Sequence, residues 1–357
     1  MSELVKGSVL FLNLYDVAEE IKLDRVRELL GARPQERVFK HAAPEYVRFE
    51  RPPVLESIDV SALAPQGATG QVKYYDYGVI SVLFELPFIG DWDKIVETAA
   101  QWMSGSEFEA AALRVVKERV KNVESALVRL YSTWLNEDYF IFHLYDVPGC
   151  PSALELAKEH GGDIARIVRA ETLPLSREEQ AEVLQSSISY YPSDLAVIGW
   201  NAAVVYDTPT GAQTAIQLLE YANSQLLEFR YYDELLTRVL AGVYSFLKTP
   251  RGFFARWKRQ KEAYRLQSVT VEVTELVERV DNSIKFLSDM YSARLYRLAA
   301  AKVGVPDYKS LVNQKLRTAE ELYRSLVDEF QASRGFVLEL MVVVILVIEL
   351  IFLFKGQ

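Results

Sequence analysis

The polar residues that could do chemistry gather most densely on one stretch of helical character, residues 220–234. With helical spacing of three and four residues, Glu220, Asn223 and Arg230 fall on one face, and Glu228 lies beside it. Carboxylates, an amide and a guanidinium on one face could bind a polar ligand. The same residues could equally pack against a neighbouring domain or subunit, and we favour packing. The stretch is therefore predicted to be a binding or packing face.

A second cluster, residues 251–265, interleaves basic and aromatic side chains. Its central members are Arg256, Trp257, Lys258, Arg259 and Lys261. Anionic lipid headgroups bind such a mixture, with the aromatic rings at the interface. RNA also binds arginine together with aromatic rings, and an ordinary solvated helix end has the same composition. We predict contact with a membrane surface or a partner, and nucleic acid is an alternative for this stretch.

Enzyme signatures are missing from the sequence. It has no P-loop, no dinucleotide-binding glycine pattern and no nucleophile elbow. The histidines lack the spacing of a metal site, and the single cysteine, Cys150, excludes an intrachain disulfide and a cysteine-rich metal site. We therefore predict a protein without catalytic residues, metal or cofactor.

The composition gives limits on partners and compartment. The 357 residues carry a net charge of −9, which makes nucleic acid an improbable partner for the acidic first part of the chain. The region 251–334 is basic by contrast. The N-terminal stretch is too acidic for a signal or transit peptide, so the bulk of the chain is expected in the cytoplasm.

The first half reads as an α/β domain with an internal repeat. A strand over 9–14 is followed by a helix, and the pattern of residues 12–17 recurs at 142–147 with another helix after it. We predict a duplicated α/β unit within residues 1–207. Its two copies would cover about 1–90 and 138–207, with a helical insert over 91–130.

Long helices dominate the second half. Helix-breaking residues occur only near 248–252 and 304–306, which predicts helices over about 210–247, 253–302 and 307–333. In the middle helix, apolar residues at three–four spacing from Val269 to Met290 indicate a coiled-coil seam. Residues 208–334 are accordingly predicted to form a helical, coiled-coil-like stalk.

The chain then has an apolar stretch over 335–354, interrupted by Glu339 and Glu349. As a helix it would be roughly 30 Å long, the thickness of a bilayer hydrocarbon core. It predicts one C-terminal transmembrane helix, and a buried core helix or the central helix of an oligomer in water is the alternative. A carboxylate inside a membrane is costly, so we assign Glu339 and Glu349 to anchoring and assembly, with Glu349 facing protein.

Three motifs resemble the required-for-meiotic-nuclear-division (YagE-like) family. They are Leu338-Glu339 followed by Ile348-Glu349, the segment Glu220 to Leu236, and Tyr77-Gly78-Val79-Ile80. The resemblance implies a membrane-anchored, oligomeric protein without assigned catalytic residues.

The sequence thus predicts an α+β protein: a duplicated α/β unit, a long helical stalk and one C-terminal transmembrane helix. The function it favours is a non-enzymatic scaffold or tether on the inner membrane. It would contact membrane lipid, be homo-oligomeric and hold an unknown protein partner. A membrane-tethered enzyme or ligand-binding protein with a pocket in the α/β domain, and a ribosome or RNA tether, are the alternatives.

Overall fold

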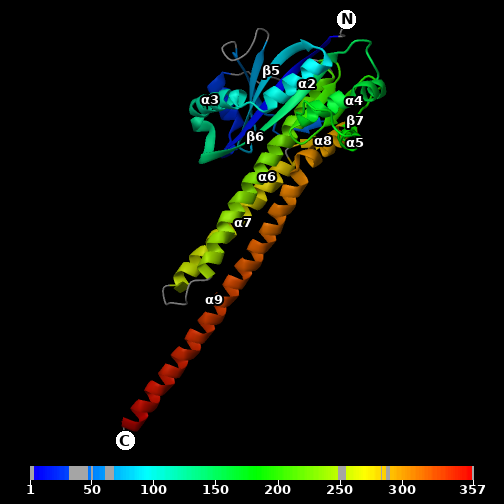
Figure 1. Ribbon diagram of the computed structural model, residues 1–357. Coiled ribbons are helices and arrows are strands. Elements are labelled where there is room, and N and C mark those ends of the chain that lie inside the picture. The colour runs from blue at the N-terminus through cyan, green and yellow to red at the C-terminus, as the bar shows by residue number, and fades with distance from the viewer. Residues whose placement is uncertain are drawn as a thin grey trace. The chain divides into compact units, whose positions relative to one another are not determined.

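The computed structural model describes residues 4–31, 47–49, 51–60, 68–247, 255–282, 284–286 and 290–355 (Figure 1). Two compact units divide the chain. The first combines Met1–Tyr231 with Glu278–Tyr308, and the second combines Tyr232–Val277 with Lys309–Gln357. The boundaries between the units fall inside three helices, after Tyr231, Val277 and Tyr308, so each unit is built from segments that are distant in sequence.

A single eight-stranded sheet organises the first unit, in the order β3-β4-β5-β1-β6-β9-β8-β7. The pairing is antiparallel throughout except between β6 and β9, which are parallel. The strands are β1 (Val5–Ile21), β3 (Val54–Ile58), β4 (Thr69–Tyr74), β5 (Val79–Gly90), β6 (Leu127–Asp146), β7 (Ser187–Ile188), β8 (Leu195–Ile198) and β9 (Ala202–Tyr206).

The long strands β1 and β6 pair at the centre, where Phe11 lies opposite Phe140. Their apolar residues are buried on both faces of the sheet, as expected for a sheet covered on two sides. The register shifts between Asp16 and Ala18, and β1 then continues to pair with the beginning of β6. This continuation explains why the helix predicted up to residue 130 is shorter: residues from Leu127 onward are drawn into the sheet.

One face of the sheet packs against five helices around an aromatic and aliphatic core. Phe11 of β1 stacks on Phe108, with ring centroids 4.0 Å apart. The Asp91 side chain caps the second of these helices by accepting a hydrogen bond from the backbone N–H of Lys94. The five helices are α1 (Leu23–Leu30), α2 (Trp92–Met103), α3 (Glu107–Asn122), α4 (Ala153–Arg169) and α5 (Arg177–Gln185).

The opposite face of the sheet packs against the first part of α6 (Ala212–Leu247), and α8 (Met290–Val303) contacts the same part of α6. Every residue of α6 from Leu218 to Phe229 is buried. A helix buried all round is normally apolar all round, yet this segment carries five polar side chains. A two-stranded sheet of β2 (Val47–Phe49) and β10 (Ile284–Phe286) also belongs to the described structure.

The two predicted copies can be compared through the sheet. Each half of the sheet has four strands, β1-β5-β4-β3 and β6-β9-β8-β7 when counted outward from the centre. In both halves the first strand of the sequence is central, the last strand lies next to it, and the other two follow outward in reverse order. However, β5 is antiparallel to β1, whereas β9 is parallel to β6. The duplication stays a prediction.

The second unit is a helical bundle of the C-terminal part of α6, most of α7 (Ala255–Asn282) and α9 (Val305–Lys355). Its core contains Val239, Val243, Leu266, Ala319 and Leu326. The helix predicted over 253–302 is wrong as a single element, because α7 ends at Asn282 and α8 begins at Met290. The predicted seam therefore does not continue along one helix.

The prediction of a transmembrane helix over 335–354 requires correction. Within the part of the chain that the structure describes, no helix is both long and apolar enough to cross a bilayer. In this part of α9 the described side chains are those of Met341 to Ile348. These residues form about 12 Å of helix, which is shorter than the roughly 30 Å thickness of a hydrocarbon core. The predictions of a membrane-anchored, single-pass scaffold and of an inner-membrane location depended on this helix, and they are wrong for the same reason.

Candidate functional site

The candidate site is a buried polar cluster between α6 and the sheet. We define it as Glu220, Asn223, Ser224, Gln225 and Glu228 of α6 with Asp16 of β1, Lys73 of β4 and Ser81 of β5. None of these residues is more than 8% exposed. Three of the four residues predicted as a polar face, Glu220, Asn223 and Glu228, therefore lie together in the interior.

Lys73 and Glu220 form a buried ion pair that joins β4 to α6. The Tyr75 hydroxyl also contacts the Glu220 carboxylate, and burial together with this charge raises the pKa of Tyr75 well above its ordinary value. The other carboxylate oxygen of Glu220, Oε1, has no hydrogen-bond donor among the described residues. The pair thus neutralises Glu220 but leaves it incompletely hydrogen-bonded.

A chain of neutral hydrogen bonds follows along the helix. Ser224 donates to the Tyr221 carbonyl at 2.8 Å, so the Tyr77 hydroxyl, 2.7 Å from Ser224 Oγ, acts as its donor. The Gln225 amide donates to the Tyr221 hydroxyl at 2.8 Å and accepts from Tyr296 of α8. These contacts fix α6 between the β4–β5 turn and α8.

Asp16 is the least compensated member of the cluster. Its side chain comes from β1 at the register shift and is 1% exposed. Neither carboxylate oxygen has a hydrogen-bond partner among the described residues. Burial, and then the charge of Glu228, raise the pKa of Asp16 well above its ordinary value. An ionised carboxylate here would be strongly disfavoured.

Arg230, the fourth predicted residue, lies at the edge of the site instead of inside it. It pairs with Glu137 of β6, and its side chain remains 32% exposed. Burial raises the pKa of Glu137, while the Arg230 charge opposes that rise. Arg230 therefore anchors α6 to β6 and offers no free cation to the buried carboxylates.

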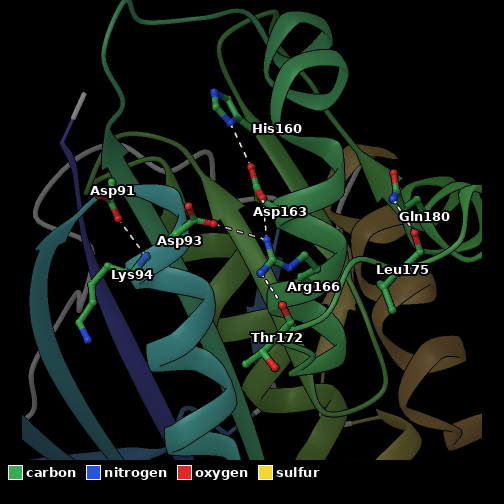
Figure 2. A network of polar contacts seen from close by, with 9 residues as sticks. All are labelled: Asp91, Asp93, Lys94, His160, Asp163, Arg166, Thr172, Leu175 and Gln180. Atoms are coloured by element: carbon green, nitrogen blue, oxygen red, sulfur yellow. Dashed lines mark hydrogen bonds and ion pairs between the residues drawn. The ribbon is translucent and has the colours of Figure 1, made fainter. Parts of the chain in front are cut away.

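A separate polar network joins helices on the other face of the sheet (Figure 2). Arg166 of α4 contacts Asp163 at 3.3 Å and Asp93 of α2 at 3.6 Å, and donates to the Thr172 carbonyl at 2.6 Å. His160 lies 3.3 Å from Asp163. The network ties α2, α4 and the segment after α4 together, so we assign it a structural role.

The remaining predicted site residues have no described side-chain environment. Arg256, Trp257, Lys258, Arg259 and Lys261 lie in α7, and Glu339 and Glu349 lie in α9, but their side chains are outside the described part of the structure. Their assignments stay predictions.

The sequence interpretation missed Asp16 and Lys73. A usable signal existed: each is a charged residue inside a strand whose neighbours are apolar or aromatic. A charge in such a strand either faces solvent or needs a buried partner. Among the described residues, no group of three or more histidine, cysteine, aspartate or glutamate side chains could hold a metal ion. The cluster can hold charge and protons, and it is built from three acids, two amides, two hydroxyls and one lysine.

Known proteins match mainly the sheet-bearing part of the chain. The family model described as "Uncharacterized protein MJ0711, N-terminal domain" matches residues 6–213. Uncharacterized protein MJ0711 of Methanocaldococcus jannaschii is 22% identical over 194 residues, which covers 54% of this chain and 59% of that protein. The chain therefore spans less than two thirds of this relative's length. No solved structure matches.

The match includes Asp16, Lys73 and Ser81 and ends before the polar segment of α6. It carries no information on the resemblance to the YagE-like family, which stays a prediction. Because the family model covers more than half of the sequence, the chain belongs to the family defined by the N-terminal domain of uncharacterized protein MJ0711.

Proposed function

We propose that the chain is a non-enzymatic assembly protein that forms a homo-oligomer through the C-terminal part of α9. The observation that carries the proposal is a run of eight consecutive large apolar side chains, Met341 to Ile348, each 48–57% exposed. Exposed apolar surface that is continuous in this way marks an interaction site. We name this run the exposed apolar segment.

The first part of α9 provides the contrast. There, Val312, Leu316, Ala319 and Leu326 form one stripe at three–four spacing, and each is buried. Ala319 and Leu326 pack in the core that α6 and α7 of the same chain share. Figure 1 shows α9 continuing past the ends of α6 and α7. The described part of the chain thus covers the apolar stripe of the first part of α9, and none of its side chains covers the exposed apolar segment.

The occupant of this surface follows from its geometry. At 100° per residue, eight consecutive apolar residues point to all sides of a helix, whereas one partner helix covers only a stripe. At least two further helices are needed. Equivalent helices from other copies supply them with closed symmetry, and each copy buries the same residues. We therefore propose an assembly of three or more chains around parallel α9 helices.

A charge in the middle of the exposed apolar segment should disrupt this assembly. Leu346→Glu would place one carboxylate per chain in the same layer of the interface, where burial and mutual repulsion oppose association. We expect self-association to weaken about tenfold or more. The measurement is the mass of the full-length chain by sedimentation and native mass spectrometry over a concentration series.

Leu311→Glu is the matched control, because Leu311 is an isolated exposed leucine of the same helix, 44% exposed. It should leave the mass unchanged. A monomeric wild-type chain in buffer would overturn the proposal, and so would a chain that binds lipid vesicles or a detergent micelle as a monomer. Equal effects of the two substitutions would also contradict it.

A further inference from the structure

Three buried oxygen atoms of the cluster have no hydrogen-bond partner among the described residues, and together they match the bonding capacity of one water molecule. They are Glu220 Oε1, Asn223 Oδ1 and Ser81 Oγ. We propose that they form a binding site for a single internal water, which accepts a hydrogen bond from Ser81 and donates to Glu220 and Asn223. This inference is independent of the proposed assembly through α9.

The register of the sheet brings Ser81 and Glu220 to the same place. Ser81 of β5 lies directly opposite Lys73 of β4, so both side chains point to the same face of the sheet. The Lys73 ammonium binds the other carboxylate oxygen of Glu220, Oε2, which puts Glu220 over this pair of strands. Asn223 follows three residues later and neighbours Glu220 on the surface of α6. The three atoms therefore belong to one part of the interface between β5 and α6.

The sizes of the side chains favour a small bridging ligand. Ser81 stands in a row between two longer side chains, Lys73 on β4 and Leu14 on β1. Its hydroxyl stays closer to the sheet than they reach, and it makes no direct hydrogen bond to α6. Because Ser81, Glu220 and Asn223 are each at most 1% exposed, bulk solvent does not satisfy them. A bridging water spans a distance that a serine hydroxyl cannot cross alone.

The count of donors and acceptors selects water as that ligand. Glu220 Oε1 and Asn223 Oδ1 are acceptors, and the amide nitrogen of Asn223 already donates to the Leu219 carbonyl at 2.8 Å. Ser81 Oγ carries one O–H group that needs an acceptor. One water molecule donates twice and accepts once, so it satisfies all three atoms. Three hydrogen bonds are also the usual number for a buried water.

The charge of the site favours a neutral ligand over a cation. Lys73 already neutralises Glu220, and the two side chains are only 10% and 0% exposed. A sodium or potassium ion would add a second positive charge close to the ammonium, in surroundings that screen charge poorly. It would also occupy the Ser81 oxygen and leave the O–H group without an acceptor. Water adds no charge and accepts from that group.

A double-mutant cycle on the full-length chain tests the bridge. Ser81→Ala and Asn223→Leu each remove one partner of the water, and the two side chains share no direct hydrogen bond. Residues without a shared partner change stability additively, whereas members of one network do not. In urea unfolding, Ser81→Ala should lower the folding equilibrium constant about fivefold in the wild-type background. In the Asn223→Leu background, which cannot hold the water, the loss should be less than about twofold.

The matched control is Ser81→Ala in a Thr98→Ala background. The Thr98 hydroxyl donates to the Lys94 carbonyl of its own helix, α2, and takes no part in the cluster. The loss caused by Ser81→Ala should therefore stay about fivefold there. Equal losses in all three backgrounds would overturn the water site.

A direct observation decides the matter if the variants do not fold. A high-resolution crystal structure of the wild-type chain should show one water oxygen about 2.7–3.2 Å from Ser81 Oγ, Glu220 Oε1 and Asn223 Oδ1. Direct contacts among these three side chains, with no water between them, would contradict the proposal. Stabilisation of the wild type, but not of Ser81→Ala, by sodium or potassium chloride relative to choline chloride would also contradict it, because that result indicates a cation site.

Discussion

Replacing Lys73 with methionine is expected to lower the free energy of unfolding by about 3–5 kcal/mol, because the substitution leaves the buried Glu220 carboxylate without its cation. Glu220 has 0% exposed side-chain surface, so water cannot replace the lysine. The Tyr75 hydroxyl remains as a donor, but one neutral hydrogen bond offsets only a small part of the loss. Urea unfolding at pH 7 measures the change.

The double variant Lys73→Met with Glu220→Gln is the matched control. It removes both charges and keeps similar volumes, and such replacements are often nearly neutral. We expect it to recover most of the stability lost in the single variant. A single variant within about 1 kcal/mol of wild type would show that Glu220 is hydrated or neutral in the folded protein. A double variant as unstable as the single one would show that packing, and not charge, dominates.

The sequence predicted the polar face of α6 better than its surroundings. Helical spacing alone placed Glu220, Asn223 and Arg230 on one face of a helix, with Glu228 beside it, because that spacing is a local property. It could not show that the whole segment is buried, since burial depends on β1, β4 and α8, which are distant in sequence. Asp16 and Lys73 were overlooked for the same reason: the burial of Asp16 and the ion pair of Lys73 with Glu220 arise only in the folded chain.

The errors in the helical region have a related cause. Apolar spacing continued from Val269 to Met290, so one helix over 253–302 fitted the pattern. The structure instead places Ile284–Phe286 in a strand that pairs with Val47–Phe49. A contact between segments so far apart in sequence overrides local helical preference. The C-terminal prediction failed differently, because an apolar run does not by itself specify what covers it.

The β4–β5 turn determines where the buried cluster meets β1. Gly78 has a φ of +103°, and its carbonyl accepts a hydrogen bond from Val17 at 3.1 Å, next to Asp16. Asp76 of the same turn accepts from Ile21 at 3.0 Å. Tyr77, between these two residues, reaches Ser224 of α6. The turn therefore holds the irregular part of β1 and one end of the cluster at the same time.

Gly78→Ala is consequently expected to lower the free energy of unfolding by about 3–4 kcal/mol, from a backbone conformation that disfavours side chains and from overpacking. A Cβ at this position would lie 1.7 Å from the Ala18 carbonyl oxygen. Because that atom belongs to the backbone of β1, the strand itself must move. Urea unfolding gives the magnitude, and loss of amide protection at Val17 and Ile21 in hydrogen exchange would locate the damage.

Gly149→Ala separates the two causes, since Gly149 also has a positive φ, +76°, but a Cβ there would have nothing within 4 Å. It should cost only about 1–2 kcal/mol, the backbone contribution alone. The difference between the two alanine variants then measures the close approach of the turn to β1. Equal losses would mean that β1 adapts without cost, and the register shift after Asp16 would not be fixed by this turn. A larger loss at Gly78 with unchanged exchange at Val17 would place the strain elsewhere.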